Sequence, residues 1–141
     1  MVNQELVRRK LSKLIQYLEE LESIKNYTFQ EYLDNHFIRR TAERLLQLIV
    51  EVATDINGHI IVEKGHLPPK NYYESFIFLG DLGVLNKSFA RQLAPSSGLR
   101  NRLVHEYEEI DDKIVYDSID TALKNYKKYV KEIDQYLDES P

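Results

Sequence analysis

Apolar residues recur at helical spacing along most of this chain, and the alternation of polar and apolar residues typical of strands is not apparent. The spacing predicts a first helix from about Asn3 to Ile24 that packs through one face. The apolar positions on that face are Leu6, Leu11, Leu14, Ile15, Leu18 and Leu21. A second, long helix is predicted to begin after Thr28, which has the capping-box partner Glu31, and to end near Gly65. Its apolar positions are Phe37, Ile38, Leu45, Leu48, Ile49, Val52 and Ile56.

Prolines divide the second half of the chain into shorter segments. The consecutive prolines within residues 66–69 end the long helix, because proline lacks a backbone N–H and disfavours helix in the residue before it. Two short helices are predicted to follow, over about 72–79 and 85–93. A further proline then breaks the chain, and Ser96 or Ser97 is expected to cap the next helix.

The last predicted helix runs from about Asp112 to Leu137. Its apolar positions are Ile114, Ile119, Leu123, Tyr126, Val130, Ile133 and Tyr136. Most tyrosines in the helical patterns are expected at the edge of the core with solvated hydroxyls, namely Tyr17, Tyr126, Tyr129 and Tyr136. The patterns together predict an all-α protein, an antiparallel bundle of four to five helices that forms one domain over residues 1–141.

The composition of the chain indicates the cellular compartment in which the protein works. The chain has no cysteine, so it has neither a disulfide framework nor a thiolate site. Its N-terminus enters a charged helix directly, and its most apolar stretch, residues 45–53, is far shorter than the ~20 residues that span a membrane. We therefore expect a cytoplasmic protein that does not enter a membrane.

Charge is unevenly distributed along the chain. The formal net charge of −4 argues against a general nucleic-acid binder, and we expect no binding to DNA. Residues 82–105, however, contain no acidic residue and four basic ones, Lys87, Arg91, Arg100 and Arg102, and acidic residues follow at once. This segment fits either a local basic patch that holds a short RNA or an ordinary solvated charged surface.

The strongest chemical signal is residues 100–107, which read Arg-Asn-Arg-Leu-Val-His-Glu-Tyr. Imidazole can exchange a proton at neutral pH, and a guanidinium can hold a phosphate and neutralise charge that develops on it. Arg100 and His105 are therefore the predicted catalytic residues of a phosphodiester-cleaving site. The spacing alone is weak evidence, because Arg102 and His105 also fit ordinary neighbours on a helix surface.

The extended pattern resembles the R-x4-H-x-Y motif of HepT-type toxins in the HEPN superfamily, with Arg100, His105 and Tyr107 at its defining positions. Residues 36–61 and 80–85 also resemble that family, so the match covers most of the chain. The resemblance implies a small, all-helical, homodimeric ribonuclease without a cofactor, encoded with an MntA-type nucleotidyltransferase antitoxin. It further implies that the antitoxin transfers AMP to the motif tyrosine, here Tyr107.

The expected reaction is metal-independent cleavage of RNA by its own 2′-hydroxyl. His105 would act as general acid or base, Arg100 would stabilise the phosphorane, and Arg102, Arg91 and Lys87 would bind the substrate. On an ideal helix, residues five apart point about 140° apart. Either the helix ends before His105, or a homodimer builds a composite site from two motifs.

Two alternatives stay open from the sequence. Asp55 and His59 lie one helical turn apart, with Glu63 a turn further, and fit a metal site, an inward hydrogen-bonded pair or a lining of the cleft beside Arg100. No further ligand accompanies them, so no metal is expected. The competing function is a non-catalytic helical module that binds a nucleotidyltransferase or a nucleotide.

Overall fold

A computed structural model describes residues 3–105 and 109–139 of the 141 in the chain. These residues form seven helices and no strand. The helices are α1 (Gln4–Lys25), α2 (Phe29–Asp34), α3 (His36–Glu63), α4 (Tyr72–Asp81), α5 (Lys87–Leu93), α6 (Ser96–His105) and α7 (Asp112–Glu139). The prediction of an all-α protein is confirmed.

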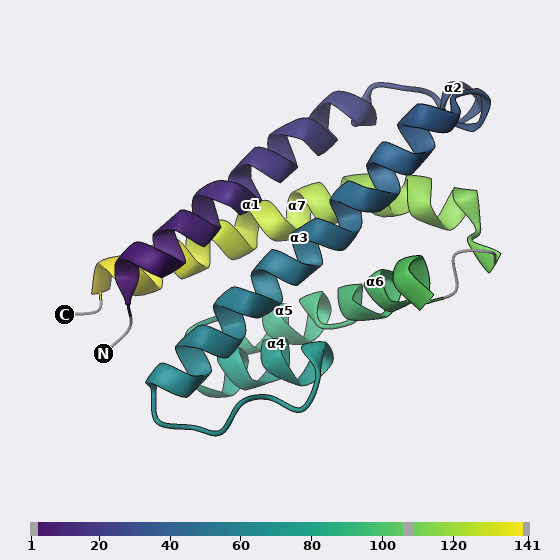
Figure 1. The fold of residues 1–141 in the computed structure, drawn as a ribbon. Coiled ribbons are helices and arrows are strands. Elements are labelled where there is room, and N and C mark those ends of the chain that lie inside the picture. Colours follow the sequence, from purple (N-terminus) through teal and green to yellow (C-terminus); the bar gives the residue numbers. More distant parts are fainter. Residues whose placement is uncertain (1–2, 106–108, 140–141) are drawn as a thin grey trace.

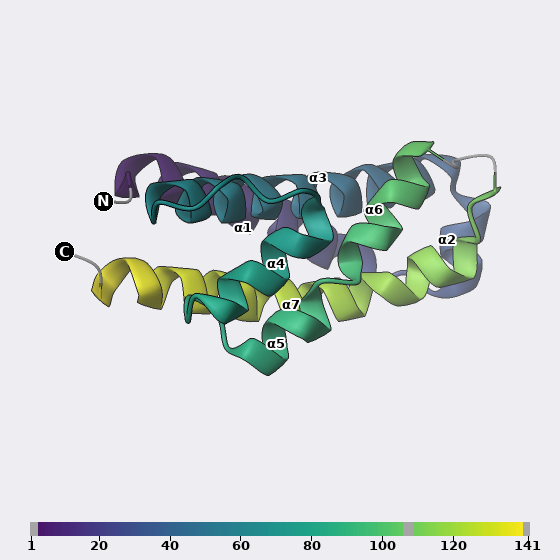
Figure 2. The same ribbon diagram turned by 90° about the horizontal axis from the view of Figure 1, so that it is seen from below.

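Three long helices, α1, α3 and α7, form the body of the bundle, and the shorter α4, α5 and α6 lie along one side of it (Figures 1 and 2). Helix α3 is central, because it packs against α1, α2, α4, α6 and α7. Helix α1 runs antiparallel to α3, and α6 runs antiparallel to α7 (Figure 1). The start of α1 and the end of α7 lie at the same end of the bundle (Figure 1).

The predicted apolar faces are largely buried, with shifts at their edges. In α1 the buried stripe is Val7, Leu11, Leu14, Leu18, Leu21 and Ile24. Ile15, Phe37 and Ile114 are exposed by 40%, 81% and 46%, so the prediction that these three face the core is wrong. Each of the three lies next to the buried stripe of its helix or before that stripe begins. Because successive residues of a helix point about 100° apart, its side chain faces away from the core.

The predicted second helix is divided into α2 and α3 at Asn35. The capping box that begins α2 is confirmed, with Glu31 N–H donating to Thr28 Oγ1 over 3.1 Å and Thr28 N–H donating to Glu31 Oε1 over 2.9 Å. Asn35 adopts an extended conformation, and its Oδ1 accepts a hydrogen bond from Ile38 N–H over 3.1 Å. The asparagine side chain thus replaces the helical hydrogen bonds at this point and starts a new helix.

The serines before the motif do not cap α6 as expected. The hydroxyl of Ser96 donates to the carbonyl of Leu93 over 2.8 Å, and that of Ser97 donates to the carbonyl of Ala94 over 2.9 Å. Both point back because the connection from α5 to α6 is so short that the last carbonyls of α5 lie within their reach.

Two tyrosines of α7 are part of the core, which corrects the expectation of solvated hydroxyls. Tyr129 donates to Asn57 Oδ1 over 2.6 Å and lies 3.0 Å from the carbonyl of Ala53, while Tyr126 shares a 2.5 Å hydrogen bond with Ser96. Burial raises the pKa of both phenols.

Helix α3 has the length and apolarity of a helix that could cross a membrane. Over its 28 residues, the most apolar 18-residue window has a mean hydropathy of 1.4, and 56% of that window is buried inside the bundle. A central core helix passes the same test, and α3 occupies that place here.

Candidate active site

Helix α6 carries both predicted catalytic residues, and His105 is its last residue. The first of the two alternatives, a helix that ends before His105, is therefore wrong. Arg100 is half-buried and turned toward α3, whereas His105 is exposed. Within one chain, the two side chains leave the same helix in different directions.

The guanidinium of Arg100 is bound to a carboxylate of α3. Its Nε and Nη2 both donate to Oε2 of Glu51, over 3.1 Å and 2.8 Å. The side chains of Arg100 and Glu51 are exposed by only 16% and 26%. This is a charge-assisted, partly desolvated pair between α3 and α6, stronger than an ion pair on an open surface.

Two further residues contact the Arg100 guanidinium. Its Cζ lies 4.8 Å from the centre of the Tyr72 ring, at the start of α4, in the geometry of a cation–π interaction. Its Nη1 donates to Oδ1 of Asn101 over 3.3 Å. Arg100 thus contacts α3 and α4 as well as its neighbour in α6.

Glu51 is held in its ionised form. Burial alone would raise the pKa of this carboxyl, but hydrogen bonds from Arg100 and Gln47, with the positive charges of Arg100 and Arg44, lower the pKa below its ordinary value. The Gln47 amide reaches the same Oε2 atom over 3.2 Å.

The basic residues of segment 82–105 are partly neutralised by acidic residues of other helices. Glu51 pairs with Arg100, and Asp81 lies 3.7 Å from the ammonium of Lys87. Arg91 of α5 and Arg102 of α6 are exposed, and within residues 3–105 and 109–139 neither forms an ion pair. Their predicted role in RNA binding stays a prediction. Tyr107, with its acidic neighbours, lies outside the described residues.

Asp55 and His59 do not pair with each other, so the interpretation of an inward hydrogen-bonded pair is wrong. Asp55 is exposed and lies 3.6 Å from the ammonium of Lys10 in α1. His59 Nε2 lies 3.0 Å from Oε1 of Glu63, one turn further along α3. Among the residues that the structure describes, no group of three or more His, Asp or Glu side chains could hold a metal ion.

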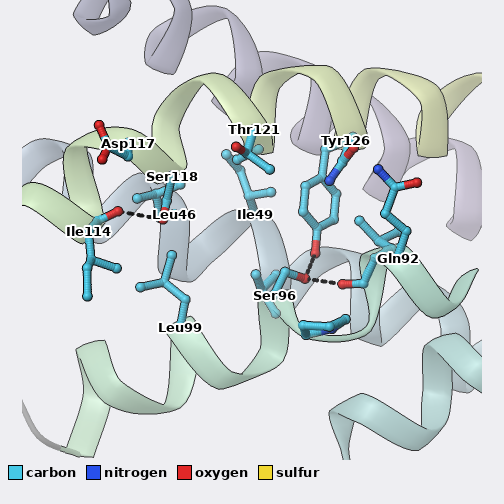
Figure 3. Close-up of a pocket in the computed structure, with 15 residues that line it drawn as sticks. Leu46, Ile49, Gln92, Ser96, Leu99, Ile114, Asp117, Ser118, Thr121 and Tyr126 are labelled. Carbon is cyan, nitrogen blue, oxygen red and sulfur yellow. Dashed lines mark hydrogen bonds between the residues drawn. The ribbon is translucent and has the colours of Figure 1, made fainter. Parts of the chain in front are cut away.

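A groove of about 400 Å³ separates α6 from α7 and has α3 as its floor (Figure 3). Leu99 of α6 and Ile114 of α7 project into it from opposite sides, and the hydrogen bond between Ser96 and Tyr126 lies further along (Figure 3). Apolar side chains dominate its lining, which also includes Leu46, Ile49, Val50, Leu93, Pro95 and Ala122.

Comparison with known proteins places this arrangement in a family. Residues 14–133 match the sequence model of the family described as Ribonuclease HepT-like. The chain belongs to the HepT-like ribonuclease family. The tRNA nuclease HepT of Aphanizomenon flos-aquae is 41% identical over 132 residues, which cover 94% of this chain and 90% of the relative. The mRNA nuclease HepT of Shewanella oneidensis is 27% identical over 85 residues, which cover 60% and 64%.

Solved structures show the same fold. The cytosolic protein of unknown function YutE from Bacillus subtilis has a TM-score of 0.84 at 20% identity, covering 97% of this chain and 92% of that protein. A tri-AMPylated HEPN toxin from Shewanella oneidensis, in complex with an MNT antitoxin, has a TM-score of 0.84 at 19% identity, covering 96% and 99%. The resemblance of the sequence to HepT-type proteins and the HEPN-like fold are both confirmed.

Two residues that contact Arg100, Glu51 and Tyr72, are absent from the functional residues predicted from the sequence. Glu51 carried a signal, because it is a charged residue within the apolar stretch 45–53 of a core helix. Tyr72 carried none, since it stands beside Tyr73 at the start of a short helix and nothing local separates the two.

Proposed function

We propose that this protein is a metal-independent endoribonuclease, the toxin of a toxin–antitoxin pair, in which Arg100 and His105 are the catalytic residues. The observation that carries the proposal is that both residues lie on one helix inside the segment that matches the HepT-like ribonuclease family. The relative with 41% identity is named a tRNA nuclease, which supports RNA as the substrate.

In the proposed reaction, RNA supplies its own nucleophile. One imidazole removes the proton of the 2′-hydroxyl, the 2′-oxygen attacks the adjacent phosphorus, and the bond from phosphorus to the 5′-oxygen breaks. A second imidazole donates a proton to the departing 5′-oxygen, which leaves 2′,3′-cyclic phosphate and 5′-hydroxyl ends. Arg100 stabilises the negative charge of the phosphorane. Arg102, Arg91 and Lys87 contact neighbouring phosphates in this proposal.

The two imidazoles of this scheme come from two copies of the chain. Each copy has one motif histidine, and in α6 the Arg100 and His105 side chains point in different directions. We infer a homodimer in which the second copy covers part of the groove between α6 and α7. Three features of the groove support this inference. Its lining is mostly apolar, Ile114 at its edge is half-exposed, and the motif helix α6 forms one of its walls.

The test of the catalytic proposal uses purified protein and total RNA, with separate tRNA and mRNA substrates. His105→Ala should lower the cleavage rate about 10²–10⁴-fold by loss of proton transfer. Arg100→Ala should lower it about 10²–10³-fold by loss of charge stabilisation. Circular dichroism checks that each variant stays folded.

Further arms of the same test address the chemistry. Cleavage should persist in excess chelator, and RNA with a 2′-O-methyl group at the cut site should survive together with DNA. Full cleavage by a folded His105→Ala variant would contradict the catalytic assignment. A wild-type protein that binds a nucleotidyltransferase but leaves every RNA intact would favour the non-catalytic module.

The proposed regulation is AMP transfer to Tyr107 by an MntA-type antitoxin. A nucleotide two residues from His105 adds bulk and a negative phosphate next to Arg102, where it competes with the RNA phosphate. The AMPylated state of a structurally similar toxin supports this expectation.

Co-expression with the partner nucleotidyltransferase tests the regulation. The toxin should become inactive and heavier by one or more AMP units, and peptide mass spectrometry should map the modification to Tyr107. Tyr107→Phe should escape modification and remain toxic. An unmodified Tyr107 in a fully neutralised complex would show instead that the antitoxin masks the site by contact alone.

A further inference from the structure

We propose that Glu51 is a positioning residue for RNA cleavage, which fixes the Arg100 guanidinium so that its remaining N–H groups face the scissile phosphate. This role rests on the proposed function of the site. It assigns a task to a residue of α3 that lies outside the R-x4-H-x-Y motif.

Counting the N–H groups of Arg100 shows which donors remain available. The Nε–H and one N–H of Nη2 are bound to Glu51, and one N–H of Nη1 is bound to Asn101. Each Nη atom has two N–H groups, so among the described residues one on Nη1 and one on Nη2 have no partner. Two N–H donors of one guanidinium are able to bind two oxygens of a phosphate.

Tyr72 also restricts the position of the guanidinium. The Cζ of Arg100 lies over the Tyr72 ring, 4.8 Å from its centre, and the carbonyl of Tyr72 accepts a hydrogen bond from Ser75 Oγ over 2.7 Å. Ser75 Oγ in turn accepts from Asn57 Nδ2 over 3.1 Å, and Asn57 Oδ1 accepts from Tyr129 over 2.6 Å. A hydrogen-bonded chain from α7 through α3 to α4 therefore ends at the residue under Arg100.

Glu51 itself has little freedom. Its side chain is exposed by only 26%, and the Gln47 amide binds the same oxygen as Arg100 does. The pair with Arg100 is neutral overall, so Glu51 removes long-range attraction for RNA while it fixes direction. An arrangement built only for binding phosphate would leave Arg100 without such a partner.

The positioning role separates turnover from binding. Without Glu51 the positive charge of the guanidinium is no longer neutralised and its orientation is lost, so RNA should bind as well or better and react more slowly. If the pair only fastens α3 to α6, its loss should lower activity in proportion to the folded fraction and leave KM unchanged.

The experiment compares Glu51→Ala and Glu51→Gln with wild type in kcat and KM for one RNA substrate. Glu51→Ala should lower kcat about 10²-fold, with KM unchanged or lower. Glu51→Gln keeps an acceptor oxygen at the same position and should restore part of kcat. Glu22→Gln is the matched control, because it removes another ion pair between helices, Glu22 with Lys127 at 3.0 Å, and should keep wild-type kcat.

A binding measurement separates the possible failures. In a His105→Ala background, fluorescence anisotropy with a short 2′-O-methyl RNA should show equal or tighter binding when Glu51 is also replaced by alanine. Weaker binding, or wild-type kcat in a folded Glu51→Ala protein, would overturn the positioning role alone. A wild-type protein that cleaves no RNA would overturn the proposed function and this role with it.

Discussion

The Arg100 side chain links the chemistry of the site to the stability of the bundle. Its pair with Glu51 joins α6 to α3 in a partly buried place, so the ionised carboxylate contributes to the free energy of unfolding as well as to the orientation of Arg100. The pKa of Glu51 is lowered in the folded protein, mainly by the hydrogen bonds from Arg100 and Gln47 acting against the effect of burial.

This lowered pKa predicts how stability depends on pH. The unfolded chain binds a proton at Glu51 at higher pH than the folded chain does, so the contribution of Glu51 is complete above its unfolded pKa of about 4.3. It is lost as pH falls through the lower, folded pKa. Urea unfolding from about pH 7 to about pH 3 should show that wild type has a larger free energy of unfolding than Glu51→Gln. This difference should shrink only below the unfolded pKa of about 4.3. A constant difference over the whole range would contradict the assignment.

At the scale of residues, the sequence predicted the role of Arg100 and missed its partner Glu51. Arg100 and His105 belong to one short segment, whose residue types are enough to suggest the chemistry. Glu51 is 49 residues away, and only the packing of α3 against α6 brings it to Arg100. A local pattern cannot show which face of a core helix meets the motif helix.

At the scale of elements, close packing of α4 against α5 depends on Gly80. A Cβ atom at this position would lie 2.8 Å from the Cβ of Ala90 and 3.3 Å from the Cα of Lys87. Both neighbours are close to the backbone of α5 and cannot turn away as the end of a long side chain can. The α4–α5 pair in turn supports α6 and Tyr72.

Gly80→Ala should therefore destabilise the protein by about 1–3 kcal/mol, the usual cost of overpacking. Gly58→Ala, in α3, is the matched control, because a Cβ there meets nothing within 4 Å. That change should stabilise the protein by about 0.5–1 kcal/mol through better helix propensity. Urea unfolding followed by circular dichroism measures both. Equal effects of the two substitutions would show that α4 and α5 are not packed through Gly80.

The elements themselves were largely predictable because their stripes repeat. The spacing of apolar residues located α1 and α7 to within a few residues, and Thr28 with Glu31 located the start of α2. The break at Asn35 was missed, because Phe37 and Ile38 continue an apolar pattern across it. The side chain of a single residue, Asn35, causes that break by capping α3. The spacing of apolar residues is read over many positions and does not reveal it.

At the scale of the whole molecule, the proposed reaction needs a second imidazole beside the one that the motif of the described chain offers. His105 is exposed at the end of α6, and Arg100 points toward α3. The groove between α6 and α7 lies along the same helix (Figure 3). From helical geometry the sequence left two alternatives, a helix that ends before His105 or a composite site from two motifs. The groove could not be predicted, because it forms only when α3, α6 and α7 pack together.

Mixing subunits tests the composite site directly. Wild-type and His105→Ala chains are mixed in equal amounts, unfolded and refolded together, and assayed on RNA. If each cleft needs both imidazoles, only dimers of two wild-type chains cleave. After random pairing, the mixture should then have about one quarter of the activity of the same total amount of wild-type protein. Independent sites in each chain would leave about one half. Wild type mixed with Glu22→Gln is the control and should lose no activity. Light scattering gives the mass of the assembly, and a monomer with activity that falls in simple proportion to the wild-type share would rule out the two-chain site.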